Sequence, residues 1–583
     1  MVRLDRLINA VSELDSAAAR VSDDSASQYV AQQAFIHARA AYKRAETLIE
    51  YFTPVTAGEM NGPAIPRMAP DEPAQIITPP DGFQVIEEML FPQVNVKERT
   101  ALSTAVRVLG GHARRAKTIA EVSSFTDTAL FDAMRLELTR VMSLGLAGFD
   151  SPVAGQSAGE AAEAIAGVRL VFAPYARGLA LVDLSLAQDL DERFLMAESW
   201  LREQSAETPL DQLTFLTTQG IPLARVLQES VIALGIPLPL EPRLWRATAA
   251  SPFDDGAWDA WAFAPARDPR ATAEVTLLGA RLFNDPVLSG DGVRSCASCH
   301  NPEKGFVDQL PRNSAIGGSG VTLRNTPTLI NAALQTGQFY DLRTTYLEDQ
   351  VAQVIQNPHE MNGSLKDAAT VVGENAWYRA AFARAFDSSS DSVVTERQIQ
   401  IALASYVRSL VRLDAPFDRY MRGDTTAMNE AARRGFNTFM GKAGCGSCHF
   451  APLFGGPLPP VFAGTDLEVI GVPDHPDTVN ATIDPDVGAF SVTRMSVHQY
   501  AFKAPSLRNS AITAPYMHNG VYQTLEEVVD FYDRGGGVGI GIDLPNQTLP
   551  ATPLMLTAQE KSDLISFLEA LTDVAAPETL RIQ

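Results

Sequence analysis

The chain of 583 residues is 46% hydrophobic and 20% charged, which excludes a disordered protein and favours two to four folded domains. Its formal net charge of −22 argues against a nucleic acid partner, because phosphate binding needs clustered Lys and Arg side chains. No run of about 18 apolar residues occurs, so we expect no membrane span.

The first 240 residues are expected to be helical. Apolar residues recur at three and four positions from Ala26 to Phe52, which predicts a helix that Pro54 ends. A loop rich in Pro and Gly is expected from Thr56 to Gly82. Similar patterns predict further helices over Lys97–Ala120, Asp127–Leu146, Ser157–Phe172, Leu184–Glu203 and Leu210–Ile232. Prolines at 237, 239 and 242 mark the expected end of this domain.

All four cysteines fall into two C-x-x-C-H motifs, which consist of Cys296, Cys299 and His300 and of Cys445, Cys448 and His449. Two thiols at this spacing can add to the two vinyl groups of one porphyrin, and the histidine that follows can ligate the iron. A redox dithiol does not need the histidine, and a zinc site needs four converging ligands. The motifs therefore predict two covalently attached haem c groups.

The two haem segments resemble an internal repeat. Each has the haem motif, then an Arg-Asn pair (Arg324-Asn325 and Arg508-Asn509), then a helix expected over Leu347–Val354 or Leu525–Tyr532. Thr557 with Glu560 forms a capping box that starts a last helix, to about Leu571. We predict a mainly α protein with a helical bundle over residues 1–245 and two cytochrome c-type domains, over 246–425 and 426–583.

Covalent haem attachment takes place outside the bacterial cytoplasm, so we expect a periplasmic protein. The residues Met1–Ile8 include charges and no apolar stretch of the signal-peptide kind. We therefore expect that a signal peptide has been removed from the given sequence.

Residues 275–583 resemble the bacterial di-haem cytochrome c peroxidase and MauG family. Besides the haem motifs, the resemblance rests on Leu278–Phe283, Asp285-Pro286, Leu288–Gly290, Gly305-Phe306, Arg324–Leu329, Asn357–Met361 and Leu507–Asn509. It implies that hydrogen peroxide reacts at the N-terminal haem, and that Gln350 and Glu360 are its distal catalytic residues. A carboxylate there can carry a proton between the two peroxide oxygens, and an amide can orient the peroxide. Without the resemblance, Glu360 would read as a solvated acid of a loop.

Many peroxidases of this family have a loop histidine that occupies the distal iron position until the protein is reduced. No histidine lies between His300 and His359, and Ile316 stands near the expected place. His359 precedes Glu360 and could interfere. We expect a five-coordinate, open N-terminal haem in the isolated protein.

The second haem takes its proximal ligand from His449, and the resemblance places the other ligand at Tyr532. A phenolate ligand lowers the potential of haem iron, whereas a thioether raises it. The alternative is that Tyr532 packs in the core and that Met517 or Met555 is the ligand.

Two further sites follow from the resemblance. Tyr340 stands where relatives have a Trp that relays electrons between the haems; the alternative is a buried aromatic side chain at a tight interface. A calcium ion is implied at Asn325, Thr513 and Pro515, through one side-chain oxygen and two backbone carbonyls, since hard oxygen ligands suit Ca²⁺.

The N-terminal part resembles the helical imelysin-type domain through Ala41–Glu46 and Gly82–Glu87. That family carries a Gly-x-His-x-x-Glu motif as a proposed metal site. Gln84 replaces the histidine here, so Glu87 would be the remaining ligand. We expect a structural module or one that docks a partner.

The predicted function is a di-haem peroxidase that reduces hydrogen peroxide with electrons passed through the C-terminal haem. The donor would be a small cytochrome c or a cupredoxin, and the acidic charge would suit a basic one. One alternative is a MauG-like oxidase, which uses peroxide-derived, high-valent haem iron at both haems to oxidise a protein or an organic substrate. Another is a non-catalytic di-haem electron carrier or sensor.

Overall fold

The computed structural model describes residues 1–68, 77–204, 210–318, 320–389 and 393–573. The fold is mainly α, as expected. Its described strands are only two short antiparallel pairs, β1 (Arg67–Met68) with β2 (Ile77–Thr78) and β3 (Leu467–Glu468) with β4 (Phe502–Lys503).

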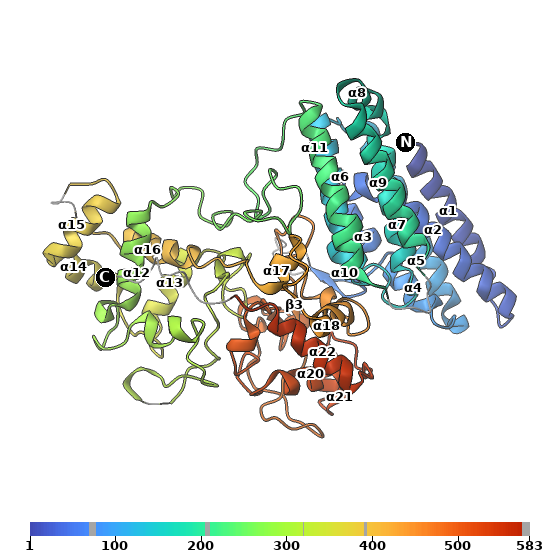
Figure 1. Ribbon diagram of the computed structural model, residues 1–583. Helices are drawn as coiled ribbons and strands as arrows, with labels where there is room; N and C mark the ends of the chain where they lie inside the picture. The colour runs from blue at the N-terminus through green and yellow to red at the C-terminus, as the bar shows by residue number, and fades with distance from the viewer. Residues whose placement is uncertain (69–76, 205–209, 319, 390–392, 574–583) are drawn as a thin grey trace.

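The N-terminal bundle contains long helices that pack side by side (Figure 1). They are α1 (Val2–Ala18), α2 (Ser25–Phe52), α5 (Arg99–Val122), α6 (Asp127–Arg140), α7 (Ser157–Phe172), α9 (Leu184–Arg202) and α11 (Ile221–Ala233). Shorter helices are α3 (Pro54–Asn61), α4 (Phe83–Leu90), α8 (Ala176–Val182) and α10 (Gln212–Phe215). Two five-residue π-helices, η2 (Val141–Gly145) and η4 (Leu216–Gly220), extend α6 and α10.

The expected loop from Thr56 to Gly82 is wrong at its start. The helix α2 ends at Phe52, just before Pro54, as predicted, but Pro54 is also the first residue of α3, which extends to Asn61. Proline is tolerated in the first helical turn because the N–H it lacks would have no partner within the helix. Residues 69–76 of this range lie outside the described part.

One helical stretch, Ser157–Val182, is long and apolar enough to cross a membrane by length and composition. The core helix of a bundle meets the same test. In this bundle α7 packs against α2, α6 and α9. The stretch is therefore weak evidence for a membrane span.

The first haem segment is built on α12 (Ala273–Asn284), α13 (Leu347–Gln356), α14 (Leu365–Glu374), α15 (Ala376–Ala385) and α16 (Glu396–Arg408). The second contains α18 (Glu430–Met440), α19 (Phe490–Thr493), α20 (Leu525–Asp533), α21 (Gly536–Gly539) and α22 (Ala558–Glu569). The short helix α17 (Pro416–Met421) lies before residue 426 but packs in the core of the second segment. Glycine lets the main helices of each segment approach closely. A Cβ on Gly279 would lie 1.8 Å from the Ala402 carbonyl oxygen of α16, and one on Gly435 would lie 1.9 Å from that of Asp563 in α22.

The internal repeat is present, but its register differs from the expected one. Asn331 and Asn509 both have left-handed backbone geometry and precede short 3-10 helices, Ala332–Leu334 and Ser510–Ile512. The side-chain oxygen of Asn331 accepts from Arg412 N at 2.7 Å, and that of Asn509 accepts from Asp573 N at 2.9 Å. The counterpart of Asn509 is therefore Asn331 and not Asn325.

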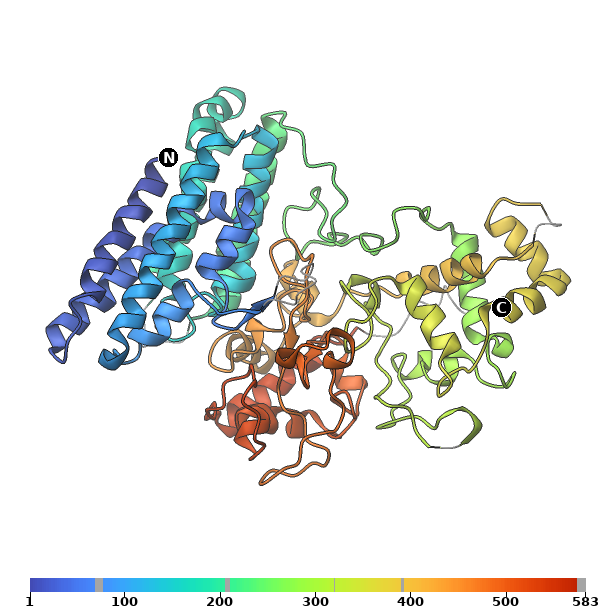
Figure 2. The same ribbon diagram turned by 180° about the vertical axis from the view of Figure 1, so that it is seen from behind.

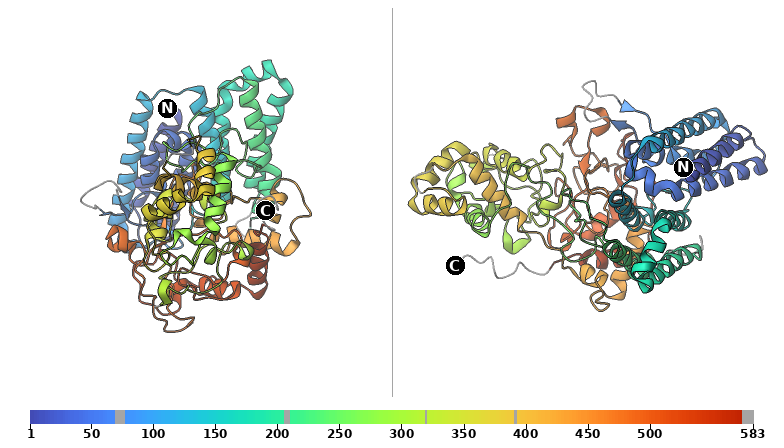
Figure 3. Two further views of the ribbon diagram at one scale, coloured as in Figure 1. Left: turned by 90° about the vertical axis from the view of Figure 1, so that its left-hand side faces the viewer. Right: turned by 90° about the horizontal axis from the view of Figure 1, so that it is seen from above.

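The second haem segment lies between the bundle and the first haem segment (Figures 1 and 2). The chain leaves the bundle after α11 and runs through an extended segment to α12 at the far side. The view from above shows the same order (Figure 3). The largest hydrophobic core joins bundle residues such as Phe215 to Phe436, Phe439 and Phe567 of the second haem segment.

Candidate haem sites

The N-terminal haem motif forms a compact turn. Cys296–Ser298 is a 3-10 helix, and the N–H of His300 donates to the Cys296 carbonyl at 2.9 Å. The Nδ1 atom of His300 lies 3.1 Å from the Phe306 carbonyl oxygen, which holds the ring and leaves Nε2 for a metal. Burial lowers the pKa of His300, so its imidazole is neutral, as a ligand must be.

The C-terminal motif repeats this geometry. Cys445–Ser447 is a 3-10 helix, and His449 Nδ1 lies 3.0 Å from the Pro505 carbonyl oxygen and 3.3 Å from that of Phe454. Burial lowers the pKa of His449 to about 4. Both histidines therefore have one nitrogen bound to the backbone and one available to iron.

None of the four cysteines, all of which the structure describes, takes part in a disulfide. Burial raises the pKa to about 12 for Cys296 and Cys445 and to about 11 for Cys299, and it raises the pKa of Cys448 still further. The thiols are therefore neutral and available to form thioethers with a porphyrin.

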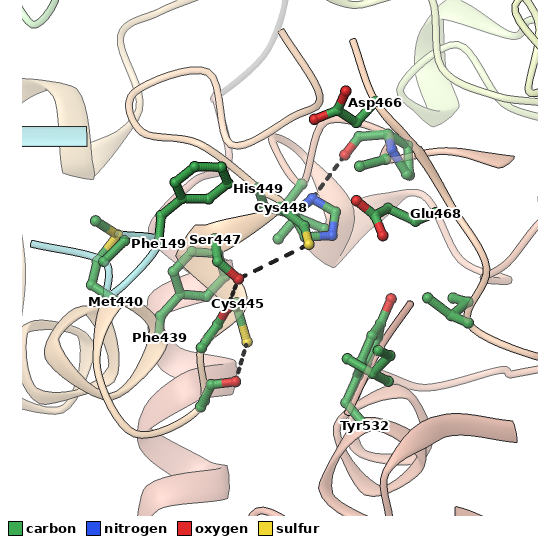
Figure 4. Close-up of a pocket in the computed structure, with 18 of the residues that line it drawn as sticks. Phe149, Phe439, Met440, Cys445, Ser447, Cys448, His449, Asp466, Glu468 and Tyr532 are labelled. Carbon is green, nitrogen blue, oxygen red and sulfur yellow. Dashed lines mark hydrogen bonds between the residues drawn. The ribbon is translucent and has the colours of Figure 1, made fainter. Parts of the chain in front are cut away.

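A cavity of about 1170 Å³ lies at the C-terminal motif and is lined by Cys445, Cys448, His449 and Tyr532 (Figure 4). A volume of this order is sufficient for a porphyrin. The cavity walls, the paired thiols and the oriented imidazole together fit a haem c group.

Tyr532 and the two alternative methionines differ in position. The Tyr532 side chain comes from α20 and extends into the cavity on the side away from the motif (Figure 4). Burial raises the pKa of Tyr532, so its phenol is protonated unless a metal binds it. Met517 also lines the cavity, whereas Met555 is 76% exposed. Met555 is therefore a poor candidate.

Glu360 lies beside the N-terminal haem motif. Asn357 Nδ2 donates to Glu360 Oε1 at 2.7 Å, and Arg294 Nη1 donates to the Glu360 carbonyl at 3.1 Å. Burial raises the pKa of Glu360, against the opposing effects of Arg343 and Asn357. The same carboxylate helps to raise the pKa of Cys299, which places it near the haem-attachment turn.

Gln350 and Glu360 are not joined by a hydrogen bond within the described residues. Gln350, from α13, lines the large cavity together with Tyr340, and Glu360 is not among the residues of that lining. Burial raises the pKa of Tyr340, so this side chain is a neutral phenol. The structure thus places Tyr340 at the wall that the two haem segments share.

The three residues expected to bind calcium all line the same cavity. Asn325 Nδ2 donates to the Leu310 carbonyl at 2.9 Å, which leaves Oδ1 as an acceptor. In the described part of the chain no hydrogen bond reaches the carbonyl oxygens of Thr513 and Pro515.

The side chain of Glu87, in the N-terminal domain, is hydrogen-bonded to other groups of the protein. Glu87 Oε1 accepts from Ala154 N at 2.6 Å and from Ser151 Oγ at 3.0 Å. Gln84 Nε2 donates to the Phe149 carbonyl at 2.8 Å. Both side chains therefore hold the loop over residues 146–157, which joins η2 to α7.

This loop is a part of the C-terminal haem site that the sequence did not reveal. Leu146, Ala147, Phe149 and Gln156 line the cavity, and the Phe149 ring lies 6.3 Å from that of Phe450. A Cβ on Gly446, within the haem motif, would lie 3.4 Å from the Ala147 Cβ. In the sequence, only the Gly82–Glu87 segment drew attention to this region, and its Gln84 and Glu87 side chains hold the loop.

The chain is similar in sequence to known proteins over about half of its length. The family described as di-haem cytochrome c peroxidase matches residues 273–426. The chain is 37% identical over 310 residues to the methylamine utilization protein MauG of Methylorubrum extorquens, covering 53% of this chain and 81% of that protein. It is 35% identical to the cytochrome-c peroxidase IdrP1 of Pseudomonas sp. strain SCT, over 57% of this chain and 92% of the other. A solved structure, described as the crystal structure of a MauG-like protein associated with microbial copper homeostasis, has 31% sequence identity to this chain and a TM-score of 0.46. The match covers 54% of this chain and 95% of the other.

These relatives and the two motif geometries identify the chain as a member of the di-haem cytochrome c peroxidase and MauG family, an oxidoreductase with two haem c groups.

Proposed function

We propose that the protein reduces hydrogen peroxide at the N-terminal haem, with Glu360 and Gln350 as catalytic residues. Electrons would pass through the C-terminal haem, from a small cytochrome c or a cupredoxin. The position of Glu360 carries the proposal, because a half-buried carboxylate with a raised pKa lies beside the haem-attachment turn. Haem iron at this site supplies the redox centre at which the O–O bond is split.

The role of Glu360 is to move a proton. Its carboxylate would accept a proton from one oxygen of hydrogen peroxide and give it to the other oxygen, which leaves as water. Asn357 orients the carboxylate through the 2.7 Å hydrogen bond to Oε1. The amide of Gln350 would hold the peroxide by a hydrogen bond.

Access to the site depends on the segment next to Glu360. The side chain of His359 is exposed, and its carbonyl oxygen accepts from Ile316 N at 3.1 Å. This arrangement directs His359 to solvent and supports an N-terminal haem that is open without prior reduction.

The test is to mix the oxidised protein with peroxide in a stopped-flow spectrometer. We expect a rapid change of the haem spectrum that Glu360→Gln slows by about 10²–10⁴-fold. Glu303, an exposed glutamate of the same segment, provides the control variant Glu303→Gln, which should react like the parent. An equal rate in the parent and in Glu360→Gln would refute the catalytic role, and an inert parent protein would favour a carrier or sensor.

A MauG-like oxidase is the second candidate, and Tyr532 favours it. A phenolate ligand lowers the potential of the C-terminal haem, so that haem could store an oxidising equivalent instead of delivering electrons. A spectral change at both haems that persists in the absence of a donor would select the oxidase. Steady, peroxide-dependent oxidation of a reduced small cytochrome would select the peroxidase.

The proposed Ca²⁺ ion would bind Asn325 Oδ1 and the carbonyl oxygens of Thr513 and Pro515. Two observations support this calcium site. All three residues line the same cavity, and the hydrogen bond that Asn325 makes through Nδ2 leaves its Oδ1 atom as an acceptor. Removal of calcium with a chelator should alter the haem spectra, and added Ca²⁺ but not Mg²⁺ should restore them, since Mg²⁺ demands a smaller octahedral site.

We also propose that the protein is periplasmic, as expected for attached haem c, and that the three domains lie over residues 1–245, 246–425 and 426–583. The N-terminal domain would be a structural module that closes the C-terminal haem site, with the loop over residues 146–157 as part of the cavity wall. An electron-donor protein would then approach the C-terminal haem from a side that the N-terminal domain does not cover.

A further inference from the structure

Lys503 lies at the wall between the C-terminal haem cavity and the Tyr340 segment. It is the second residue of β4, which pairs with β3. Its side chain lines the cavity, and its backbone N–H donates to the Tyr340 carbonyl at 2.9 Å. Two residues further along, the Pro505 carbonyl holds the proximal ligand His449. Lys503 therefore contacts the relay position directly and lies close in the chain to the residue that orients the haem ligand.

The ammonium group of Lys503 has only neutral partners. It donates to Gln335 Oε1 and to the Gly337 carbonyl, the latter at 3.1 Å. Within the described residues no carboxylate lies within 4.0 Å of it. The other Lys and Arg side chains of the cavity wall are paired: Lys442 with Glu560 at 2.8 Å, and Arg202 with Glu198 at 3.0 Å.

An unpaired cation is costly in such a place, because burial removes the hydration of the ammonium group and nothing of opposite charge replaces it. Burial lowers the pKa of Lys503 to about 7, and the more distant Asp341 opposes this only in part. The site has the properties of an incomplete ion pair whose anion is absent.

We propose that Lys503 binds a carboxylate in this cavity, and that this carboxylate is a propionate of the haem attached through Cys445 and Cys448. A porphyrin carries two propionates, and the cavity that holds it exposes a single Lys without a carboxylate partner. The proposal rests on the two haem c groups and holds for a peroxidase as for an oxidase.

The consequence is a positioning role. Lys503 would join the haem edge to the Tyr340 segment, which it already holds through the Tyr340 and Gly337 carbonyls. Its positive charge near the haem favours the reduced iron, which has one positive charge fewer. Loss of that charge should therefore lower the midpoint potential of the C-terminal haem.

The experiment compares Lys503→Gln, Lys503→Arg and Lys442→Gln in the di-haem protein by redox titration. For Lys503→Gln we expect the ferric form of the C-terminal haem to be favoured about tenfold over the parent, which corresponds to a midpoint potential lower by about 59 mV. Lys503→Arg should keep the parent potential, and so should Lys442→Gln, whose charge is paired and exposed. An unchanged potential in Lys503→Gln, or an equal shift in Lys442→Gln, would overturn the proposal.

The source of the carboxylate is tested separately. The propionate bending band in the resonance Raman spectrum should shift in Lys503→Arg, because the geometry of the donor changes while its charge stays. This Raman measurement on Lys503→Arg still tests the proposal if Lys503→Gln does not retain two haems. A propionate band that does not shift would refute a contact between Lys503 and the propionate. If acetate at constant ionic strength changes the potential of the parent and not of Lys503→Gln, the site binds a free carboxylate, and the haem assignment is wrong.

Discussion

Arg140 binds Asp150 through two hydrogen bonds, 2.7 Å from Nη1 to Oδ2 and 2.6 Å from Nη2 to Oδ1, in the buried centre of the bundle. Lys43 Nζ lies 2.7 Å from the same carboxylate. Asp150 belongs to the loop whose neighbours Phe149 and Ser151 line the C-terminal haem cavity. One buried carboxylate thus fixes a wall of the haem site to the helices of the bundle.

Asp150→Asn should destabilise the protein strongly, because it removes a buried negative charge that Arg140 and Lys43 share and leaves two cations with Glu46 as their common carboxylate partner. We expect a loss of about 3–5 kcal/mol, measured by urea unfolding followed by the helical circular dichroism signal. The control is Asp189→Asn, which breaks the surface pair with Arg193 and should cost about 0.5 kcal/mol at most. Equal stability of the two variants would show that the buried cluster does not anchor the loop.

The same carboxylate should make stability depend on pH. Burial works to raise the pKa of Asp150, but Arg140 and Lys43 outweigh it and hold that pKa well below 3.8. A carboxyl group with a lowered folded pKa stabilises the protein above its unfolded pKa, and this contribution is lost as the pH falls through the folded value. Acid unfolding of Asp150→Asn should therefore show a shallower dependence on pH below about 4 than that of the parent. Parallel curves would contradict this.

Glu360 should impose a rising pH profile on the peroxide reaction. The carboxylate form accepts the proton, and burial raises the pKa of Glu360 above its ordinary value of 4.5. The second-order rate constant of the oxidised protein should therefore rise with pH through this raised pKa and then level off. Glu360→Gln should be slow at every pH and lack the rise, whereas Glu303→Gln should keep it. A rise that persists in Glu360→Gln would assign the ionisation to another group.

The sequence predicted the parts of the molecule that local patterns encode. The helix over Ser157–Phe172 has the predicted bounds, because its apolar positions follow the helical period and its ends are clear. The predicted helix over Asp127–Leu146 is α6 followed by the π-helix η2, and an apolar pattern does not distinguish the two. The haem motifs were predictable because the chemistry fixes their spacing.

The wall of the C-terminal haem site could not be predicted, because it forms by packing between distant parts of the chain. Nothing in the local sequence around Phe149 indicates that it meets Phe450. The unpaired state of Lys503 is equally hidden, since it depends on which carboxylates the fold places elsewhere. The roles of Gln350, Tyr340 and the calcium ligands stay predictions.

Tyr532 and Met517, two of the candidate ligands of the second iron, both line the C-terminal cavity, and variants can separate them. If Tyr532 is the ligand, Tyr532→Met should raise the potential of this haem, because a thioether replaces a phenolate. Tyr532→Phe should change its absorption spectrum, while Met517→Leu should leave it unaltered. If the spectrum changes in Met517→Leu and not in Tyr532→Phe, Met517 is the ligand of the iron and Tyr532 is not.

Tyr340 should make electron transfer between the haems depend on proton movement. Burial raises the pKa of Tyr340, which lines the cavity, so the phenol is protonated and its oxidation releases a proton. Electron transfer from the reduced C-terminal haem to the oxidised N-terminal haem should therefore be slower in D₂O than in H₂O. Tyr340→Trp should be faster and insensitive to the isotope, because an indole can be oxidised without losing its proton, and Tyr340→Phe should be slower than both. Flash reduction with detection at the two haem bands measures these rates. Equal rates in the parent and in Tyr340→Phe would mean that electrons move between the haems without oxidising Tyr340. The side chain would then have only a packing role at the interface between the two haem segments.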